Sequence, residues 1–167
     1  KLYLECTSGI SGDMTVGALL DLGADREILK KALDSLAVPG FQVKISRVTK
    51  AGLDVCDFDV RLDAAHENHD HDMAYLYGND PHGDGHGEHH HEHHHEHRGL
   101  SEILSIIAGA DMTAGAKETA EKIFRILAEA EAKAHGTTVE NVHFHEVGAV
   151  DSIVDILSVS VCLDSLG

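Results

Sequence analysis

The hydrophobic positions of this chain follow helical spacing in some segments and strand spacing in others. Apolar residues three and four positions apart, with capping residues or glycines at the ends, predict helices. The predicted helices are residues 14–22, 25–37, 100–108, 113–135 and 149–166. Two segments with alternating apolar residues, 41–49 and 53–62, flank Lys50-Ala51-Gly52 and predict a β-hairpin. A short apolar run at residues 2–6, ahead of a glycine loop, predicts one more strand.

This order of elements favours an α/β (α+β) fold, in which a small mixed sheet with a hairpin is packed by about five helices. In the long helix 113–135 we expect Ile123, Phe124, Ile126 and Leu127 to face the core. The chain has 167 residues, enough for one ordinary core, so we expect residues 1–62 and 98–167 to form a single domain.

The formal charge restricts the partners. With 13 basic and 29 acidic residues the chain carries a net charge of −16, which argues against nucleic acid or an anionic membrane as a partner. No apolar run reaches the length of about 18 residues that a membrane helix needs. The three cysteines, Cys6, Cys56 and Cys162, are far apart, so we expect reduced core thiols and a cytoplasmic protein.

Residues 63–97 are rich in histidine and form an insertion in the predicted domain. Between residues 66 and 97 there are twelve histidines and eight carboxylates, with no lysine or arginine. Imidazole suits nickel, copper and zinc, and we expect the insertion to be disordered without metal and to release metal below about pH 6. Its candidate metal ligands are His66, His69, His71, His82, His86, His89, His90, His91, His93, His94, His95 and His97. An internal expression tag and a solvated linker that chelates metal incidentally are the two alternatives.

The loop Ser8-Gly9-Ile10-Ser11-Gly12-Asp13 precedes the first predicted helix. Its glycines and the exposed amides of a helix N-terminus can hold a phosphate, although the loop lacks the lysine of a P-loop. The alternative is an ordinary turn in which Asp13 caps the helix. A carboxylate beside a bound phosphate would repel it unless a divalent cation lay between them, so Asp13 also indicates metal.

A second group of polar residues lies around the start of the last helix. His143 and His145 point to the same side of an extended segment and precede Glu146. On the helix, Asp151, Asp155, Ser158 and Cys162 share one stripe among apolar residues. Because an unpaired buried carboxylate is costly, the two aspartates must be exposed in a cleft, paired with histidine or bound to a cation. The alternative is that Asp151 caps the helix and the histidines are ordinary strand residues.

Three motifs together resemble the LarC family of nickel insertion proteins, and the likeness spans essentially the whole chain. They are Leu2-Tyr3-Leu4-Glu5-Cys6 with Ser8-Gly9-Ile10-Ser11-Gly12-Asp13-Met14, the histidine-rich insertion, and His143-Phe144-His145-Glu146-Val147-Gly148-Ala149-Val150-Asp151-Ser152-Ile153-Val154-Asp155. Glu5 departs from the family, where we expect aspartate. Family members are longer, and their C-terminal domain, associated with nucleotide binding, has no counterpart in this chain.

The resemblance implies that Ni²⁺ is inserted into pyridinium-3,5-bisthiocarboxylic acid mononucleotide to form the nickel-pincer cofactor. In the full-length protein it implies use of CTP with Mg²⁺ or Mn²⁺, contact with the C-terminal domain and a possible homo-oligomer. Forming a carbon–nickel bond displaces a proton, and His143, His145 or Glu146 is the candidate base. The resemblance assigns the phosphate to Ser8, Gly9, Ser11 and Gly12. It assigns nickel or magnesium to Asp13, Asp151 and Asp155.

Two other functions compete with this hypothesis. The first is a nickel storage or chaperone module that acts through the histidine-rich insertion. The second is a metal-dependent phosphohydrolase that uses the same histidine and aspartate cluster.

Overall fold

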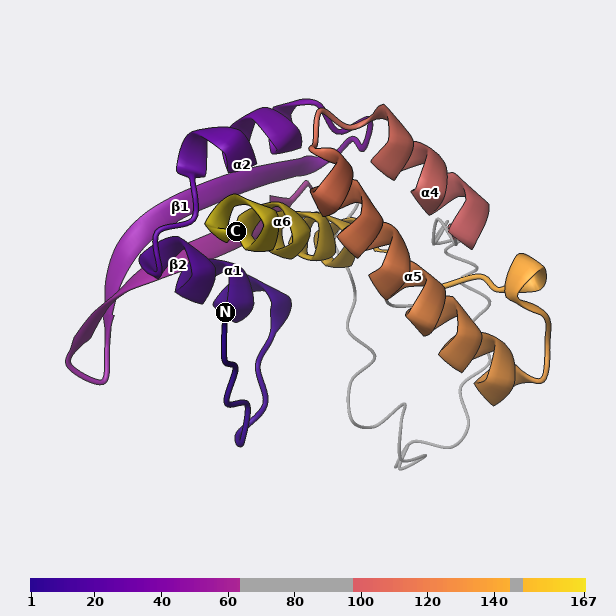
Figure 1. Cartoon of the computed structure of the whole chain (residues 1–167), viewed down its shortest axis with the longest axis horizontal. Helices are drawn as coiled ribbons and strands as arrows, with labels where there is room; N and C mark the ends of the chain where they lie inside the picture. Colours follow the sequence, from indigo (N-terminus) through magenta and orange to yellow (C-terminus); the bar gives the residue numbers. More distant parts are fainter. Residues whose placement is uncertain (64–97, 145–148) are drawn as a thin grey trace, which may run out of the picture.

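A computed structural model describes residues 1–63, 98–144 and 149–167, and it shows helices packed around one antiparallel hairpin (Figure 1). The elements of the described residues are α1 (Gly12–Asp21), α2 (Arg26–Asp34), β1 (Phe41–Lys50), β2 (Leu53–Leu62), α4 (Leu100–Gly109), α5 (Ala114–His135), the short 3₁₀ helix η1 (Val139–Asn141) and α6 (Val150–Leu166). The predicted mixed α and β fold is confirmed. The histidine-rich insertion, apart from Asp63, lies outside the described residues.

Local capping signals in the sequence fix several helix ends. The Asp25 carboxylate accepts from the N–H groups of Glu27 and Ile28 at 2.8 and 3.1 Å, as expected for the cap of α2. Gly136 ends α5 in the left-handed conformation with φ 64°. Helix α2 ends at Asp34, three residues before the predicted end.

The predicted hairpin is formed, and its turn is one residue shorter than predicted, because Lys50 belongs to β1 and pairs with Leu53. Its register runs from Phe41 opposite Leu62 to Lys50 opposite Leu53. Ala51 and Gly52 both have positive φ, 52° and 81°, which matches the twist of a tight hairpin. One face of the ribbon is apolar and packs with α1, α2 and α6 in a first core cluster.

A second cluster contains residues of α4, α5, α6 and the segment after η1. Helix α6 belongs to both clusters and runs between the hairpin side and the α4–α5 side of the molecule (Figure 1). The core-facing stripe of α5 is Phe124 with four alanines, Ala116, Ala120, Ala128 and Ala132. The prediction for Ile126 was wrong, since it is 57 % exposed, because four-residue spacing from Phe124 selects the alanines and leaves Ile126 on the outer face.

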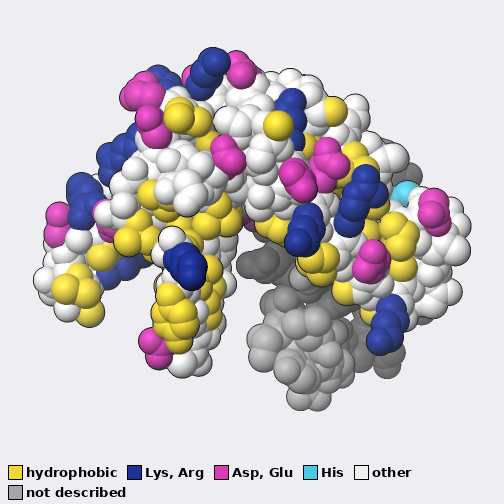
Figure 2. All heavy atoms as spheres, in the orientation of Figure 1, with side chains coloured by type: hydrophobic (Ala, Val, Ile, Leu, Met, Phe, Trp, Pro, Cys, Tyr) yellow, Lys and Arg dark blue, Asp and Glu magenta, His cyan; other side chains and the backbone are white. Residues whose placement is uncertain are grey.

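The strand predicted at residues 2–6 is not formed. A strand requires a hydrogen-bonded neighbour, and the sheet in the described residues contains only β1 and β2, both antiparallel. The N-terminal segment instead projects from α1, with Leu2, Tyr3 and Leu4 exposed (Figures 1 and 2). Within the described part of the chain, no helix has both the length and the apolar character of a membrane span.

Candidate metal and substrate site

Helices α1 and α6 meet at the N-terminus of α1, where Gly12 lies against Asp155. A Cβ atom at Gly12 would lie 2.7 Å from the Asp155 Cβ, so only glycine allows this approach. The backbone N–H of Asp13 donates to the Asp155 carboxylate. The predicted metal ligands Asp13 and Asp155, far apart in sequence, are therefore brought together.

Asp155 is in an unfavourable electrostatic environment. Burial, followed by the charges of Asp13 and Asp151, raises the pKa of Asp155 from 3.8 to about 6. Its Oδ1 atom is buried and has no hydrogen-bond partner among the described residues. A carboxylate oxygen that is buried without a partner needs a water or a cation.

The other two aspartates border this position with local partners. The exposed Asp13 carboxylate accepts from the Ser11 hydroxyl, and the half-buried Asp151 carboxylate accepts from the Ser152 N–H at 2.8 Å. Ser11, not Asp13, is the N-cap residue of α1. Within residues 1–63, 98–144 and 149–167, no three histidine, cysteine or acidic side chains converge closely enough to hold a metal ion.

The predicted phosphate-binding residues divide into two places. Ser8 and Gly9 form an exposed turn, in which the Gly9 N–H donates to the Cys6 carbonyl at 3.1 Å and Gly9 has φ 79°. Ser11 and Gly12 lie at the α1 N-terminus, beside the aspartates. A phosphate at this helix end would face three carboxylates, so it requires a bridging cation.

His143 lies on a short extended segment beside Arg98 and Gly99, the first described residues after the histidine-rich insertion. Gly99 forms an isolated antiparallel bridge with His143, and the Phe144 N–H donates to the Arg98 carbonyl at 3.2 Å. Phe144 is buried and its ring makes an edge contact with Phe124, whereas His143 is exposed. His145 and Glu146 lie outside the described residues. The structure thus fixes the point where the insertion re-enters the domain next to the first histidine of the motif.

Sequence reasoning missed Arg98. This arginine is only 5 % exposed, and its Nε lies 3.3 Å from a Glu102 carboxylate oxygen. Arginine is seldom buried without a paired carboxylate. The available signal was its place as the first basic residue after the insertion, four residues before an acidic one.

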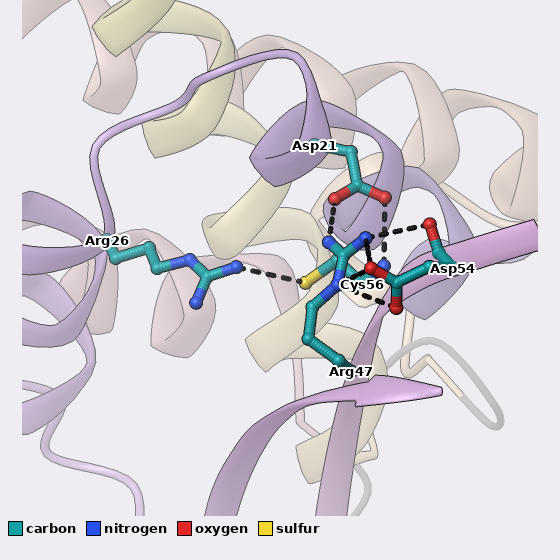
Figure 3. A network of polar contacts seen from close by, with 5 residues as sticks. All are labelled: Asp21, Arg26, Arg47, Asp54 and Cys56. Atoms are coloured by element: carbon teal, nitrogen blue, oxygen red, sulfur yellow. Dashed lines mark hydrogen bonds and ion pairs between the residues drawn. The ribbon is translucent and has the colours of Figure 1, made fainter. Parts of the chain in front are cut away.

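A network of polar contacts at the opposite end of α1 was also missed (Figure 3). Asp21 accepts from the Arg47 guanidinium and, at 2.8 Å, from the Cys56 N–H, and Arg47 also contacts Asp54. The hydrogen bond from Cys56, followed by that from Arg47, lowers the pKa of Asp21. This network fastens α1 to β2 and lies away from the acidic cluster at the start of α1.

The prediction of core thiols holds for two of the three cysteines. All three are free, and Cys56 and Cys162 are buried. Burial, and to a lesser extent the neighbouring Cys56, raises the pKa of the Cys162 thiol to about 12. Cys6 is exposed on the N-terminal segment, so its expected place in the core was wrong.

Comparison with known proteins gives one consistent result. A family model described as nickel insertion protein matches residues 2–167. The chain is 51 % identical to a pyridinium-3,5-bisthiocarboxylic acid mononucleotide nickel insertion protein of Alkaliphilus metalliredigens, covering 99 % of this chain and 37 % of that protein. Proteins with the same name from Geobacillus kaustophilus and Acetivibrio thermocellus are 42 % and 39 % identical, with 99 % of this chain and 36 % of each protein covered. The chain therefore spans little more than a third of these relatives. No solved structure matches it.

Proposed function

Because the chain belongs to the nickel insertion protein family, we propose that it is the part of a longer enzyme that inserts nickel into a pyridinium mononucleotide. The substrate is the one named for the relatives, pyridinium-3,5-bisthiocarboxylic acid mononucleotide, and the product is the nickel-pincer cofactor. The observation that carries the proposal is the acidic cluster of Asp13, Asp151 and Asp155, in which a buried carboxylate oxygen lacks a partner.

The histidine motif supplies the proton acceptor. A carbon–nickel bond replaces a ring C–H bond, so a base must accept the proton at the pyridinium carbon. His143, His145 and Glu146 are the candidates. The Gly99 bridge places the backbone of His143, and proton transfer would require its exposed imidazole to be oriented by the bound substrate.

The acidic cluster supplies the cation. The oxygen ligands of Asp13, Asp151 and Asp155 suit Mg²⁺ or Mn²⁺, and they can also accept Ni²⁺. A cation bound there would offset the three negative charges and connect the amides of Ser11 and Gly12 to the substrate phosphate. Ser8 and Gly9, on the adjoining turn, would contact the nucleotide. CTP would bind to the remainder of the full-length protein.

The histidine-rich insertion supplies nickel. Ligands that exchange metal suit a reservoir, whereas bond formation requires rigidly held groups. Since the insertion rejoins the domain beside His143, nickel released from it is at high local concentration near the motif.

We further propose a cytoplasmic lyase-type enzyme whose first domain contacts the rest of its own chain and forms a homo-oligomer.

The test uses the full-length protein with His143→Ala and Asp151→Ala. We expect both variants to lose maturation of the cofactor while bulk nickel binding by the insertion survives. His135→Ala is the matched control, because His135 is exposed at the end of α5 and its imidazole pairs with Glu131 at 3.1 Å. Normal maturation in both site variants would overturn the proposal.

The two alternatives give different results. Deletion of residues 66–97 removes all transfer from a storage or chaperone module, whereas an enzyme still works at saturating nickel. Turnover of simple phosphate esters by residues 1–167 would favour a metal-dependent phosphohydrolase, for which the acidic cluster is the specific observation.

A further inference from the structure

Ser158 of α6 has a hydroxyl group without a partner in the described residues, although the residue is completely buried. Other serines of the same helix donate to their own backbone. Ser160 donates to the Ile156 carbonyl at 2.8 Å and Ser165 to the Cys162 carbonyl at 2.9 Å. The Ser158 hydroxyl does not make the equivalent bond, which leaves its oxygen available to another group.

Ser158 and Asp155 are neighbours on the surface of α6. Residues three positions apart on a helix have adjacent side chains, and the stripe that holds both also carries Asp151. Asp155 faces the N-terminus of α1, where it contacts Gly12. The buried oxygens without a partner in the described residues are Oδ1 of Asp155 and Oγ of Ser158. Because each is costly alone and the two residues are helical neighbours, a single ligand that contacts both oxygens would satisfy them together.

The chemistry of the surroundings selects that group. The candidate ligand atoms are a carboxylate oxygen and a hydroxyl oxygen, and the negative charges of Asp13 and Asp151 act on the same carboxylate. A water molecule would satisfy the two oxygens but would not offset the crowded negative charge. Hard cations prefer ligand sets made only of oxygen, whereas nickel binds better to imidazole.

We propose that Asp155 and Ser158 form the inner wall of a site for a resident Mg²⁺ or Mn²⁺ ion, and that nickel is not the occupant of this site. Asp13 and Asp151, whose charges act on Asp155, would be the ion's further ligands. The inference rests on the proposed role of the acidic cluster and refines it, because it adds Ser158 as a ligand and assigns the two metals to different residues. Nickel then belongs to the histidines.

The experiment measures Mn²⁺ binding to residues 1–167 by electron paramagnetic resonance. Ser158→Ala is expected to weaken Mn²⁺ binding by about tenfold or more, and Asp155→Asn to remove binding at this site. Ser160→Ala is the matched control, since Ser160 is equally buried on the same helix but bonded to its own backbone. The insertion is present in every variant, so its own Mn²⁺ binding is common to all of them. Nitrogen hyperfine coupling identifies Mn²⁺ that is bound to imidazole.

Each outcome separates the inference from the proposed function. Loss of binding in Asp155→Asn, with unchanged binding in Ser158→Ala, overturns the role of Ser158 and leaves the cation site. Unchanged binding in both variants, or nitrogen coupling on the Mn²⁺ that Asp155→Asn removes, overturns the site itself. Neither result affects the nickel insertion assay of the His143 variant. If circular dichroism shows that the alanine variant is misfolded, Ser158→Cys replaces it, because a neutral thiol of similar size is a poor ligand for Mn²⁺.

Discussion

Replacement of Asp155 by asparagine is expected to stabilise the cation-free protein at pH 7. In the folded chain the pKa of Asp155 is about 6, against 3.8 for an ordinary aspartate. This difference corresponds to roughly 3 kcal/mol of unfavourable free energy when the carboxylate is ionised in the folded state. The side chain is partly exposed, so this value is an upper limit. Asparagine carries no charge and still offers an oxygen to the Asp13 N–H.

The sign of the effect sets its pH range. Because the folded pKa lies above the unfolded one, the folded state binds more protons between about pH 4 and pH 6. The contribution of Asp155 to the free energy of unfolding is therefore lost as the pH rises through this range. At pH 4 the carboxyl is largely protonated in the folded protein, and the asparagine variant has little advantage left.

Urea denaturation in the presence of a chelator, at pH 7 and at pH 4, measures this difference. We expect the variant to exceed the unsubstituted protein by up to about 3 kcal/mol at pH 7 and by much less at pH 4. Millimolar Mg²⁺ should reverse the order at pH 7, because only the aspartate gains from the cation. Asp34→Asn, at the exposed end of α2, is the control and should change little. A less stable Asp155 variant at pH 7 without cation, or an equal gain at both pH values, would refute the reasoning.

Further predictions follow from packing and exposure. Gly12→Ala is expected to lower the free energy of unfolding by about 1–3 kcal/mol in urea denaturation, because the added Cβ meets the Asp155 carboxylate. Gly109→Ala is the control and should not destabilise the protein, because the space around Gly109 is open. Phe124→Ala should lower the free energy of unfolding by about 3–5 kcal/mol and Ile126→Ala by far less, because Phe124 is fully buried and Ile126 is 57 % exposed. Comparable losses in the two variants, measured by thermal and urea unfolding, would contradict this burial. A thiol reagent should modify Cys6 rapidly and the two buried cysteines only on unfolding, and rapid labelling of more than one thiol would contradict the core packing.

The elements that the sequence predicts correctly are those with local signals. The Asp25 cap, the Gly136 helix end and the hairpin turn near Gly52 each act within a few residues, so a pattern can locate them. The buried face of α5 could not be predicted from hydrophobicity alone, because four small alanines and not Ile126 face the neighbouring helices. The run at residues 2–6 has the composition of a strand, but pairing depends on a partner elsewhere in the chain.

The candidate site was predictable in its residue types and not in its distances. Sequence spacing places Asp151 and Asp155 on one stripe of α6, but only the fold brings the start of α1 against them. The burial of Arg98 and the bridge between Gly99 and His143 likewise depend on long-range pairing, for which the sequence carries no local signal.

Helix α6 connects the two halves of the proposed chemistry. Asp155 lies on the side of α6 that meets α1, with Ser158 one turn along the same stripe, whereas Ile153 and Leu157 belong to the cluster that contains Phe144. The neighbour of Phe144 is His143, so the backbone that carries the proposed base is anchored to the same helix that carries the proposed cation site. Densely packed cores resist small displacements, so this packing keeps the two backbone segments in place relative to each other. Metal supply and bond formation are therefore separable: an enzyme that lacks the insertion should need more nickel but retain its maximal rate.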